Sequence, residues 1–296
     1  MSRTQSALQS LRKLATPSGA LAFWGRYLRD KDVSRAIDEN PTALNELGYD
    51  PWGYHPESAK ALYSFGRLIH SYFRPEVHGI EHIPNGRVLL VPNHSGQLPF
   101  DALVVATSCL LQARPPRLVR SMVERWTPTL PFINQAFSRS GCVVGDPINC
   151  RNLLLAENAI LVFPEGTKGS GKIWPNRYKL APFGRGFMRL ALETQSPVVP
   201  IAVIGAEESI PSLYDLKPLA KLLGAPYIPV PALLPFLGPL AMLPLPVKMQ
   251  IHFGEPMYFD GPFDDEDELI DRKVRVVQDA VQDLIDRGLR ERKSIF

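Results

Sequence analysis

A histidine and an aspartate flank one turn in the sequence VLLVPNHSGQLPFD, which covers residues 88–101. The apolar run at 88–91 predicts a buried strand that delivers Asn93 and His94 to its carboxyl end. Asp101 follows the turn and opens an apolar segment over 102–111, which predicts a buried helix. Sites in open α/β sheets form where a strand leads into a helix. The pair is either an imidazole base held by a carboxylate, or a hydrogen-bonded loop histidine beside a helix-capping aspartate.

A second group of chemically useful residues follows another predicted strand, over 159–163. The chain there reads FPEGT, and the segment after it carries several glycines and basic residues. Cations in such a segment can receive phosphate groups. The alternative for each of them is a solvated basic face.

The composition is that of a folded globular chain. Of its 296 residues, 45% are hydrophobic and 21% are charged, and the formal net charge is +3. So mild a charge gives no argument for a nucleic-acid partner, and we expect none. The 3 cysteines lack metal-ligand spacing, which favours reduced structural thiols in a cytosolic-type environment. We expect no metal, no cofactor, no signal peptide and no membrane-spanning helix.

Apolar strands alternate with amphipathic helices along most of the chain. This pattern predicts an α/β fold, with a largely parallel mixed sheet covered by helices on both faces. Predicted strands cover 76–83, 88–91, 118–119, 142–144, 159–163, 198–203 and 247–253, and predicted helices cover 58–73, 102–111, 149–158, 183–193 and 264–290. We expect a loosely attached helical N-terminal extension over 1–57 and a catalytic domain over 58–296.

Two apolar segments depart from the alternating pattern. Residues 20–28 gather Phe23, Trp24 and Tyr27, which predict either core packing or contact with a membrane interface. Residues 222–247 contain no charged residue and many prolines, which excludes a continuous helix or an interior strand. That segment is either a loop packed on the core or an apolar surface that enters lipid headgroups.

Four blocks in this order make the chain similar to the glycerolipid acyltransferase family, which includes lysophospholipid and 1-acylglycerol-3-phosphate acyltransferases. They are Asn93-His94 with Asp101, the weaker stretch over 141–152, FPEGT over 163–167, and VVPI over 198–201. The FPEGT sequence after a buried strand is the most specific of them. The resemblance covers roughly residues 72–256 and leaves the N-terminal segment outside.

The resemblance implies transfer of a fatty acyl group from acyl-CoA or acyl carrier protein to a hydroxyl of a glycerolipid. His94 would be the general base, and Asp101 would orient it and stabilise the imidazolium that forms. The substrate-binding residues predicted in this way are Asn93, Glu165, Gly166, Thr167, Lys168, Lys172, Arg177 and Arg185. The partners would be the lipid acceptor, the acyl donor and a membrane surface, with peripheral attachment on the cytoplasmic face.

Two departures from the family pattern bear on the acceptor. Six residues separate His94 from Asp101, where the family commonly has four, so the longer turn must still bring the aspartate back. The second block commonly carries an arginine for a glycerol phosphate, and here Arg151 is the nearest candidate. The missing arginine weakens a lysophosphatidate acceptor specifically and leaves room for a neutral one. A lysophospholipid- or lysophosphatidate-like acceptor stays the first hypothesis, and a neutral acceptor such as diacylglycerol, which would make storage lipid, is an alternative. A non-catalytic lipid-binding protein is a further alternative.

Overall fold

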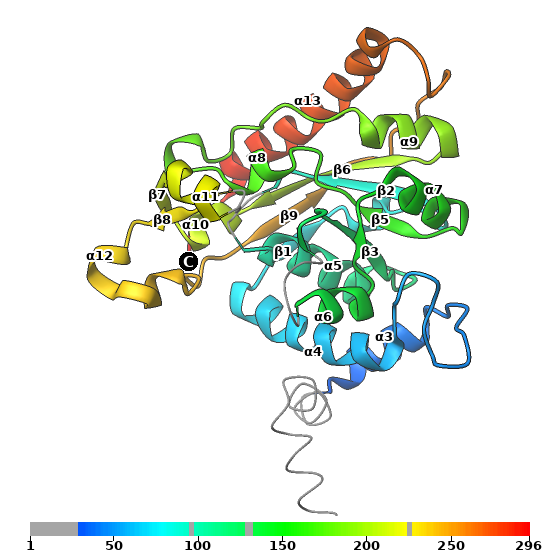
Figure 1. Cartoon of the computed structure of the whole chain (residues 1–296), viewed down its shortest axis with the longest axis horizontal. Helices are drawn as coiled ribbons and strands as arrows, with labels where there is room; N and C mark the ends of the chain where they lie inside the picture. Colours follow the sequence, from blue (N-terminus) through cyan, green and yellow to red (C-terminus); the bar gives the residue numbers. More distant parts are fainter. Residues whose placement is uncertain (1–28, 95–97, 128–132, 224–226) are drawn as a thin grey trace, which may run out of the picture.

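The computed structural model describes residues 29–94, 98–127, 133–223 and 227–296. A seven-stranded sheet with the order β1-β9-β6-β2-β5-β3-β4 lies at its centre (Figure 1). Its strands are β1 (Glu76–His78), β2 (Val88–Pro92), β3 (Val119–Val123), β4 (Val143–Val144), β5 (Ala159–Leu161), β6 (Val198–Ile204) and β9 (Gln250–Phe253). Strands β6, β2, β5, β3 and β4 are parallel to one another, whereas β9 runs antiparallel to β6. The predicted largely parallel mixed sheet is confirmed.

The central strands are apolar at every position because both faces of the sheet are covered. Every residue of β2, β5 and β6 is buried. A strand with only one covered face alternates polar and apolar residues, whereas these strands read as continuous apolar runs. The carboxyl ends of β2, β5, β3 and β6 share one edge of the sheet, since these strands are parallel.

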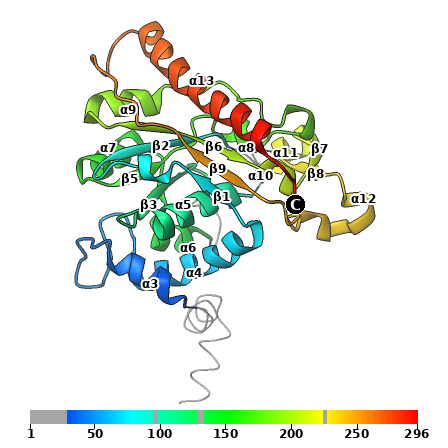
Figure 2. The same ribbon diagram turned by 180° about the vertical axis from the view of Figure 1, so that it is seen from behind.

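Helices from separate parts of the chain cover the two faces. One hydrophobic core lies under α4 (Pro56–Phe73) and α5 (Phe100–Gln112), and the other lies under α7 (Pro147–Leu155), α9 (Gly186–Thr194) and α13 (Asp267–Glu291). Figures 1 and 2 show these two layers on opposite sides of the sheet. The shorter elements beside them are η1 (Ile80–His82), α6 (Ile133–Ser140), α8 (Thr167–Ser170), η3 (Trp174–Asn176) and α10 (Ala206–Ser209).

The described part of the N-terminal extension is packed into the domain. Helix α3 (Lys31–Asp38) buries Val33, Ala36 and Ile37 in the core beneath α4 and α5. Asp50 forms a buried ion pair with Arg120 of β3, 2.7 Å long. The expected loose attachment is therefore wrong for residues 29–57, because their apolar face completes the core. The domain boundary at 57 stays a prediction, and Phe23, Trp24 and Tyr27 lie outside the described residues.

Smaller differences from the sequence prediction have local causes. The strand expected over 76–83 ends at His78, since Gly79 takes a left-handed backbone with φ of 71° and a 3₁₀ turn follows. In α13 the predicted apolar face is buried except for Leu269 in its first turn, which is 39% exposed.

The proline-rich segment forms short elements, as its composition predicts. Helix α11 (Lys217–Leu223) leads into it, and β8 (Pro229–Pro231) pairs with β7 (Ser212–Asp215) in a separate two-stranded sheet. Helix α12 (Leu234–Leu237) and η4 (Gly238–Met242) follow, and each has a proline in its first turn. These elements project from one end of the sheet (Figure 1). Among the described residues, no helix is both long and apolar enough to cross a membrane.

Candidate active site

The turn after β2 brings His94 and Asp101 together. His94 Nδ1 and Asp101 Oδ2 lie 2.7 Å apart, with Asp101 in the first turn of α5. Asp101 is fully buried, and its Oδ1 accepts the backbone N–H of Ala102 at 2.7 Å. The longer turn therefore still closes the pair, and the carboxylate fixes the ring so that Nε2 is the nitrogen left for a substrate proton.

The imidazole of His94 sits between a carboxylate and an aromatic ring. The ring of Phe163, in the FPEGT sequence, lies 4.2 Å from the imidazole centroid to centroid. The His94 side chain keeps 19% of its surface exposed. The imidazole is thus held on one edge, packed on one face, and still accessible.

Glu165 holds the main chain around His94 and is fully buried. Its carboxylate accepts the backbone N–H of His94 at 2.8 Å and that of Ala181 at 2.5 Å. Lys172 Nζ lies 2.8 Å from the same carboxylate, and the Lys172 side chain is only 7% exposed. Both side chains are therefore engaged with each other and with the main chain around His94, and their predicted contacts with substrate stay predictions.

Asn93 joins two strands of the sheet. Its amide nitrogen donates to the backbone carbonyl of Val203 at 3.0 Å, and its amide oxygen accepts the Val203 N–H at 2.7 Å. Asn93 is completely buried. Both ends of the amide are satisfied by β6, and the predicted contact of Asn93 with substrate stays a prediction.

The remaining predicted binding residues lie on the FPEGT turn and after it. Gly166 has φ of 55° and is the N-cap residue of α8, with Thr167 half-buried and Lys168 exposed after it. Arg177 is exposed and stacks over the Trp174 ring at 4.3 Å. Arg185 does not join this group, because its guanidinium pairs with Asp267 and Asp271 of α13.

Gly169 makes a close approach that the sequence interpretation missed. A Cβ atom at this position would lie 2.7 Å from the Cβ atoms of both His94 and Glu165. Only a residue without a side chain permits this packing. The glycines after FPEGT were the only sequence signal for this contact. They could not be interpreted without knowing that the loop carrying His94 packs against Gly169.

Two carboxylates after β6 were also missed. Glu207 accepts the backbone N–H of Tyr178 at 2.5 Å. Glu208 accepts the Tyr178 hydroxyl at 2.8 Å and pairs with Arg292 at 2.7 Å. Desolvation by burial raises the pKa of Glu207 to about 7. The sequence GAEES directly after an apolar strand could have revealed them, because β6 ends at the same edge as β2.

The second sequence block supplies no free arginine. Arg151, the candidate named from the sequence, pairs with Glu193 at 2.7 Å on the α9 side of the sheet. Arg120 lies beside this block and donates to the carbonyl of Gly141 at 2.9 Å, but it is buried in its ion pair with Asp50. Both guanidinium groups are therefore engaged by the protein itself.

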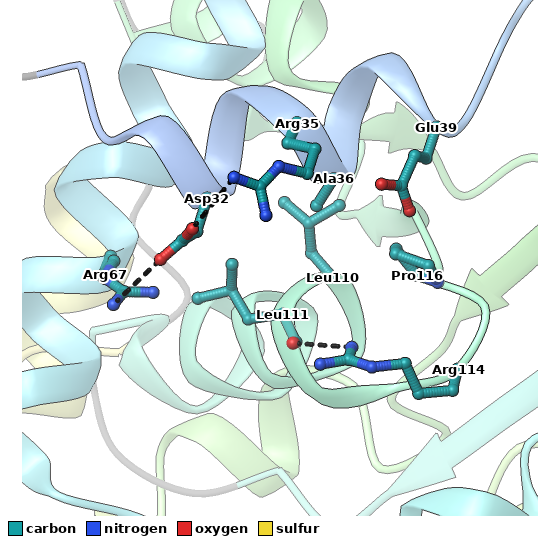
Figure 3. Close-up of a pocket in the computed structure, with 9 residues that line it drawn as sticks. All are labelled: Asp32, Arg35, Ala36, Glu39, Arg67, Leu110, Leu111, Arg114 and Pro116. Carbon is teal, nitrogen blue, oxygen red and sulfur yellow. Dashed lines mark hydrogen bonds and ion pairs between the residues drawn. The ribbon is translucent and has the colours of Figure 1, made fainter.

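Two cavities lie apart from the histidine. One, of about 430 Å³, opens between α3, α4 and the C-terminal end of α5 (Figure 3). Leu110 in its wall is about 14 Å along α5 from Asp101, at 1.5 Å per residue. The other, of about 590 Å³, lies at the ends of β3 and β4 and is lined in part by Trp52, Thr127 and Asn149. His94 lines neither cavity.

Comparisons with known proteins agree with this arrangement. The family model described as Acyltransferase matches residues 74–204. An uncharacterized protein of Mycobacterium leprae is 38% identical over 258 residues, covering 86% of this chain and 70% of that protein. A Gallus gallus protein named as a DGAT1/2-independent enzyme synthesizing storage lipids is 25% identical, covering 66% of this chain and 54% of that protein.

Among solved structures, the 1-acyl-sn-glycerophosphate (LPA) acyltransferase PlsC from Thermotoga maritima has the same fold. The TM-score is 0.53 at 18% sequence identity, over 99% of this chain and 100% of that one. Fold and site thus define an α/β acyltransferase with a histidine–aspartate pair at the carboxyl edge of its sheet. The chain belongs to the acyltransferase family and shares its fold with a glycerolipid-acylating enzyme, in agreement with the family predicted from its four blocks.

Proposed function

We propose that this protein moves a fatty acyl group from an acyl thioester, acyl-CoA or acyl carrier protein, to a hydroxyl of a glycerolipid at a membrane surface. The observation that carries the proposal is the 2.7 Å hydrogen bond between His94 Nδ1 and Asp101 Oδ2. It leaves Nε2 able to remove the proton of an acceptor hydroxyl. General-base catalysis of this kind contributes ~10²–10⁴-fold.

The reaction needs only these two side chains for its proton transfers. The acceptor oxygen loses its proton to His94 and attacks the thioester carbonyl carbon, forming a tetrahedral oxyanion. The carbon–sulfur bond then breaks, and the imidazolium returns the proton to the departing thiolate. Asp101 stabilises the imidazolium between these steps. The three cysteines play no part: Cys109 and Cys150 are buried, and burial raises the pKa of each cysteine thiol above its ordinary value.

Most of the cations predicted to bind a phosphate group are paired with carboxylates of the protein, which favours a neutral acceptor over a phosphate-bearing one. Lys172 and Arg185 are both paired with carboxylates, as is Arg151. Lys168 and Arg177 are exposed. The vertebrate relatives named for storage-lipid synthesis point in the same direction. Mono- or diacylglycerol is therefore the acceptor class that we propose ahead of lysophosphatidate.

Attachment to a membrane surface is part of the proposal, and the proline-rich segment supports it. Phe236 is 83% exposed, Leu240 62% and Leu243 64%. Helix α4 extends the apolar surface: Leu68 is 53% exposed, and the Tyr72 hydroxyl of the same helix donates to the carbonyl of Pro244 at 2.6 Å. A large exposed apolar patch marks an interaction site, and a lipid surface suits an enzyme with lipid substrates. Location on the cytoplasmic face stays a prediction.

The test is an acyl-transfer assay with labelled acyl-CoA and a panel of acceptors, run beside His94→Ala. Label should enter one lipid class and be lost in the variant, which should fold normally because His94 is partly exposed. Transfer to diacylglycerol but not lysophosphatidate would support the neutral acceptor. Full activity of His94→Ala would exclude the assigned base. If acyl-CoA and acyl carrier protein both fail as donors, non-catalytic lipid binding becomes the better hypothesis.

A further inference from the structure

Lys172 is a buried cation between two buried carboxylates. Its Nζ lies 2.8 Å from Glu165 Oε2 and 3.6 Å from Glu207 Oε1. The side chains of all three residues are at most 7% exposed. Removing a lysine from water costs free energy unless the charge is paired. The ammonium group is therefore directed into the protein and does not face solvent, where a substrate phosphate would arrive.

The same ammonium group reaches the main chain of the proposed base. Lys172 Nζ donates to the backbone carbonyl of His94 at 3.4 Å, while Glu165 accepts the backbone N–H of His94 at 2.8 Å. The N–H and the C=O of one residue are thus held by the two members of one ion pair. Gly169 allows this approach, because any side chain there would press on His94 and Glu165.

We propose that Lys172 is a positioning residue, which fixes the main chain of His94 through Glu165 so that the imidazole stays on Asp101 and faces the substrate. This proposal rests on the proposed function, in which His94 is the base. It replaces the phosphate-binding role that the sequence suggested for Lys172 and adds a residue outside the FPEGT sequence to the catalytic scaffold.

Removal of the lysine would leave the two buried carboxyl groups without their shared cation. Desolvation already raises the pKa of Glu207 to about 7, against the opposing charge of Lys172. With Lys172 removed, two carboxylates would share one buried site, and at least one would take up a proton. Glu165 would lose the ammonium group that lies 2.8 Å from it, so the carboxylate that accepts the His94 N–H would be held less firmly in place. A misplacement of ~1 Å at a catalytic group can cost ~10²-fold in rate.

The experiment compares kcat and KM for the donor and the acceptor in Lys172→Met, Lys172→Arg and the wild type. In Lys172→Met we expect kcat to fall ~10²-fold while both KM values change by less than ~2-fold. Lys172→Arg should recover part of the rate, because a guanidinium group keeps a cation between the carboxylates. If Lys172→Met does not fold, Lys172→Met/Glu207→Gln takes its place, since it leaves only one buried carboxylate.

Lys60→Met is the matched control. Lys60 also lies between two carboxylates, 2.7 Å from Asp38 and 2.9 Å from Glu57, and is 11% exposed, but it belongs to the outer side of α4. Its loss should lower stability and leave kcat per folded molecule unchanged. Unchanged kcat in folded Lys172→Met would overturn the proposal. A rise in KM with kcat preserved would also overturn it, and would return Lys172 to substrate binding.

A second measurement separates this proposal from the proposed function. The Nδ1 proton of His94, hydrogen-bonded to Asp101, should give a downfield resonance in the NMR spectrum of the full chain. We expect this resonance to move or broaden in Lys172→Met and to stay in place in Lys60→Met. If the wild type transfers no acyl group, the proposed function fails, and the positioning role is then decided by this resonance. An unshifted resonance in Lys172→Met overturns it.

Discussion

Asp101 Oδ2 lies 2.7 Å from His94 Nδ1, and its carboxylate is fully buried in the first turn of α5. The pair is held from both sides of one turn, since β2 fixes the histidine and α5 fixes the aspartate. A carboxylate in this place selects the tautomer in which Nε2 is free to accept a proton.

Asp101→Asn should lower kcat by on the order of 10²- to 10⁴-fold. An asparagine of the same size can donate its N–H to Nδ1, which turns Nε2 into the protonated nitrogen. The acceptor hydroxyl then has no base. Steady-state kinetics would measure the loss, and a thermal melt close to that of the wild type would assign it to chemistry. Near-normal kcat would argue that Asp101 serves only as a structural hydrogen-bond acceptor.

Gly169→Ala should reduce both activity and stability. The added Cβ would lie 2.7 Å from the Cβ atoms of His94 and Glu165, so the catalytic turn must shift. Gly186→Ala is the control, because a Cβ there meets no atom within 4 Å. The control should match the wild type or gain about 0.4–1 kcal/mol, as Gly-to-Ala changes do at compatible sites. Equal activity in the two variants would contradict the tight packing under the histidine.

The buried ion pair between Asp50 and Arg120 should contribute more to stability than surface pairs do. Arg120→Met leaves the Asp50 carboxylate buried without its cation, which should cost about 3–5 kcal/mol. Arg272 and Glu268 form an exposed pair on α13, and Arg272→Ala should cost no more than about 0.5 kcal/mol. Urea unfolding of the two variants gives both numbers. Similar losses would mean that the N-terminal segment is not anchored through this pair.

Stability should depend on pH through Glu207. Its pKa is raised by desolvation from 4.5 to about 7 in the fold, so the folded protein binds this proton more tightly than the unfolded chain. The contribution to stability is complete below about pH 4.5 and is lost as the pH rises through about 7. Glu207→Gln, which does not titrate, should therefore gain stability relative to the wild type over this range, by up to about 3 kcal/mol. Urea unfolding at about pH 5 and about pH 8 tests this. A difference independent of pH would mean that Lys172 keeps Glu207 ionised.

Membrane binding should weaken when Phe236 and Leu240 are replaced by aspartate. These side chains are 83% and 62% exposed, so their loss should leave the fold intact. Each large apolar side chain contributes roughly 1.5–3 kcal/mol when buried, so partitioning should fall at least about 10-fold per substitution. Leu47→Asp is the control, since Leu47 is 77% exposed in the loop between α3 and α4. Liposome flotation measures the effect. Equal flotation of all three variants would place the membrane contact elsewhere.

The strands and helices around the site follow from the sequence alone. The strongest strands, β2, β5 and β6, are short apolar runs, and α4, α9 and α13 are amphipathic at helical spacing. These signals are local. A strand that is buried on both faces is a short continuous apolar run, and a helix that is buried on one face repeats its apolar residues at helical spacing, so each can be recognised within about a dozen residues. The family and its histidine–aspartate pair were predictable for the same reason. Both residues stand at the two ends of the turn in one strand–turn–helix unit.

Only the tertiary structure decided what the other polar residues do. Asn93 bonds to Val203, 110 residues away in the sequence, and Arg185 pairs with α13, more than 80 residues away. Lys172 meets Glu207 for the same reason: the carboxyl ends of β5 and β6 share one edge. The sequence gives the charge of such a side chain but not its partner. The partner belongs to an element that is distant in the chain and becomes a neighbour only in the folded protein. A cation that binds phosphate stays accessible to solvent, whereas a structural cation is removed from water and paired inside the protein. That difference is set by the packing of the fold, so the sequence does not show it.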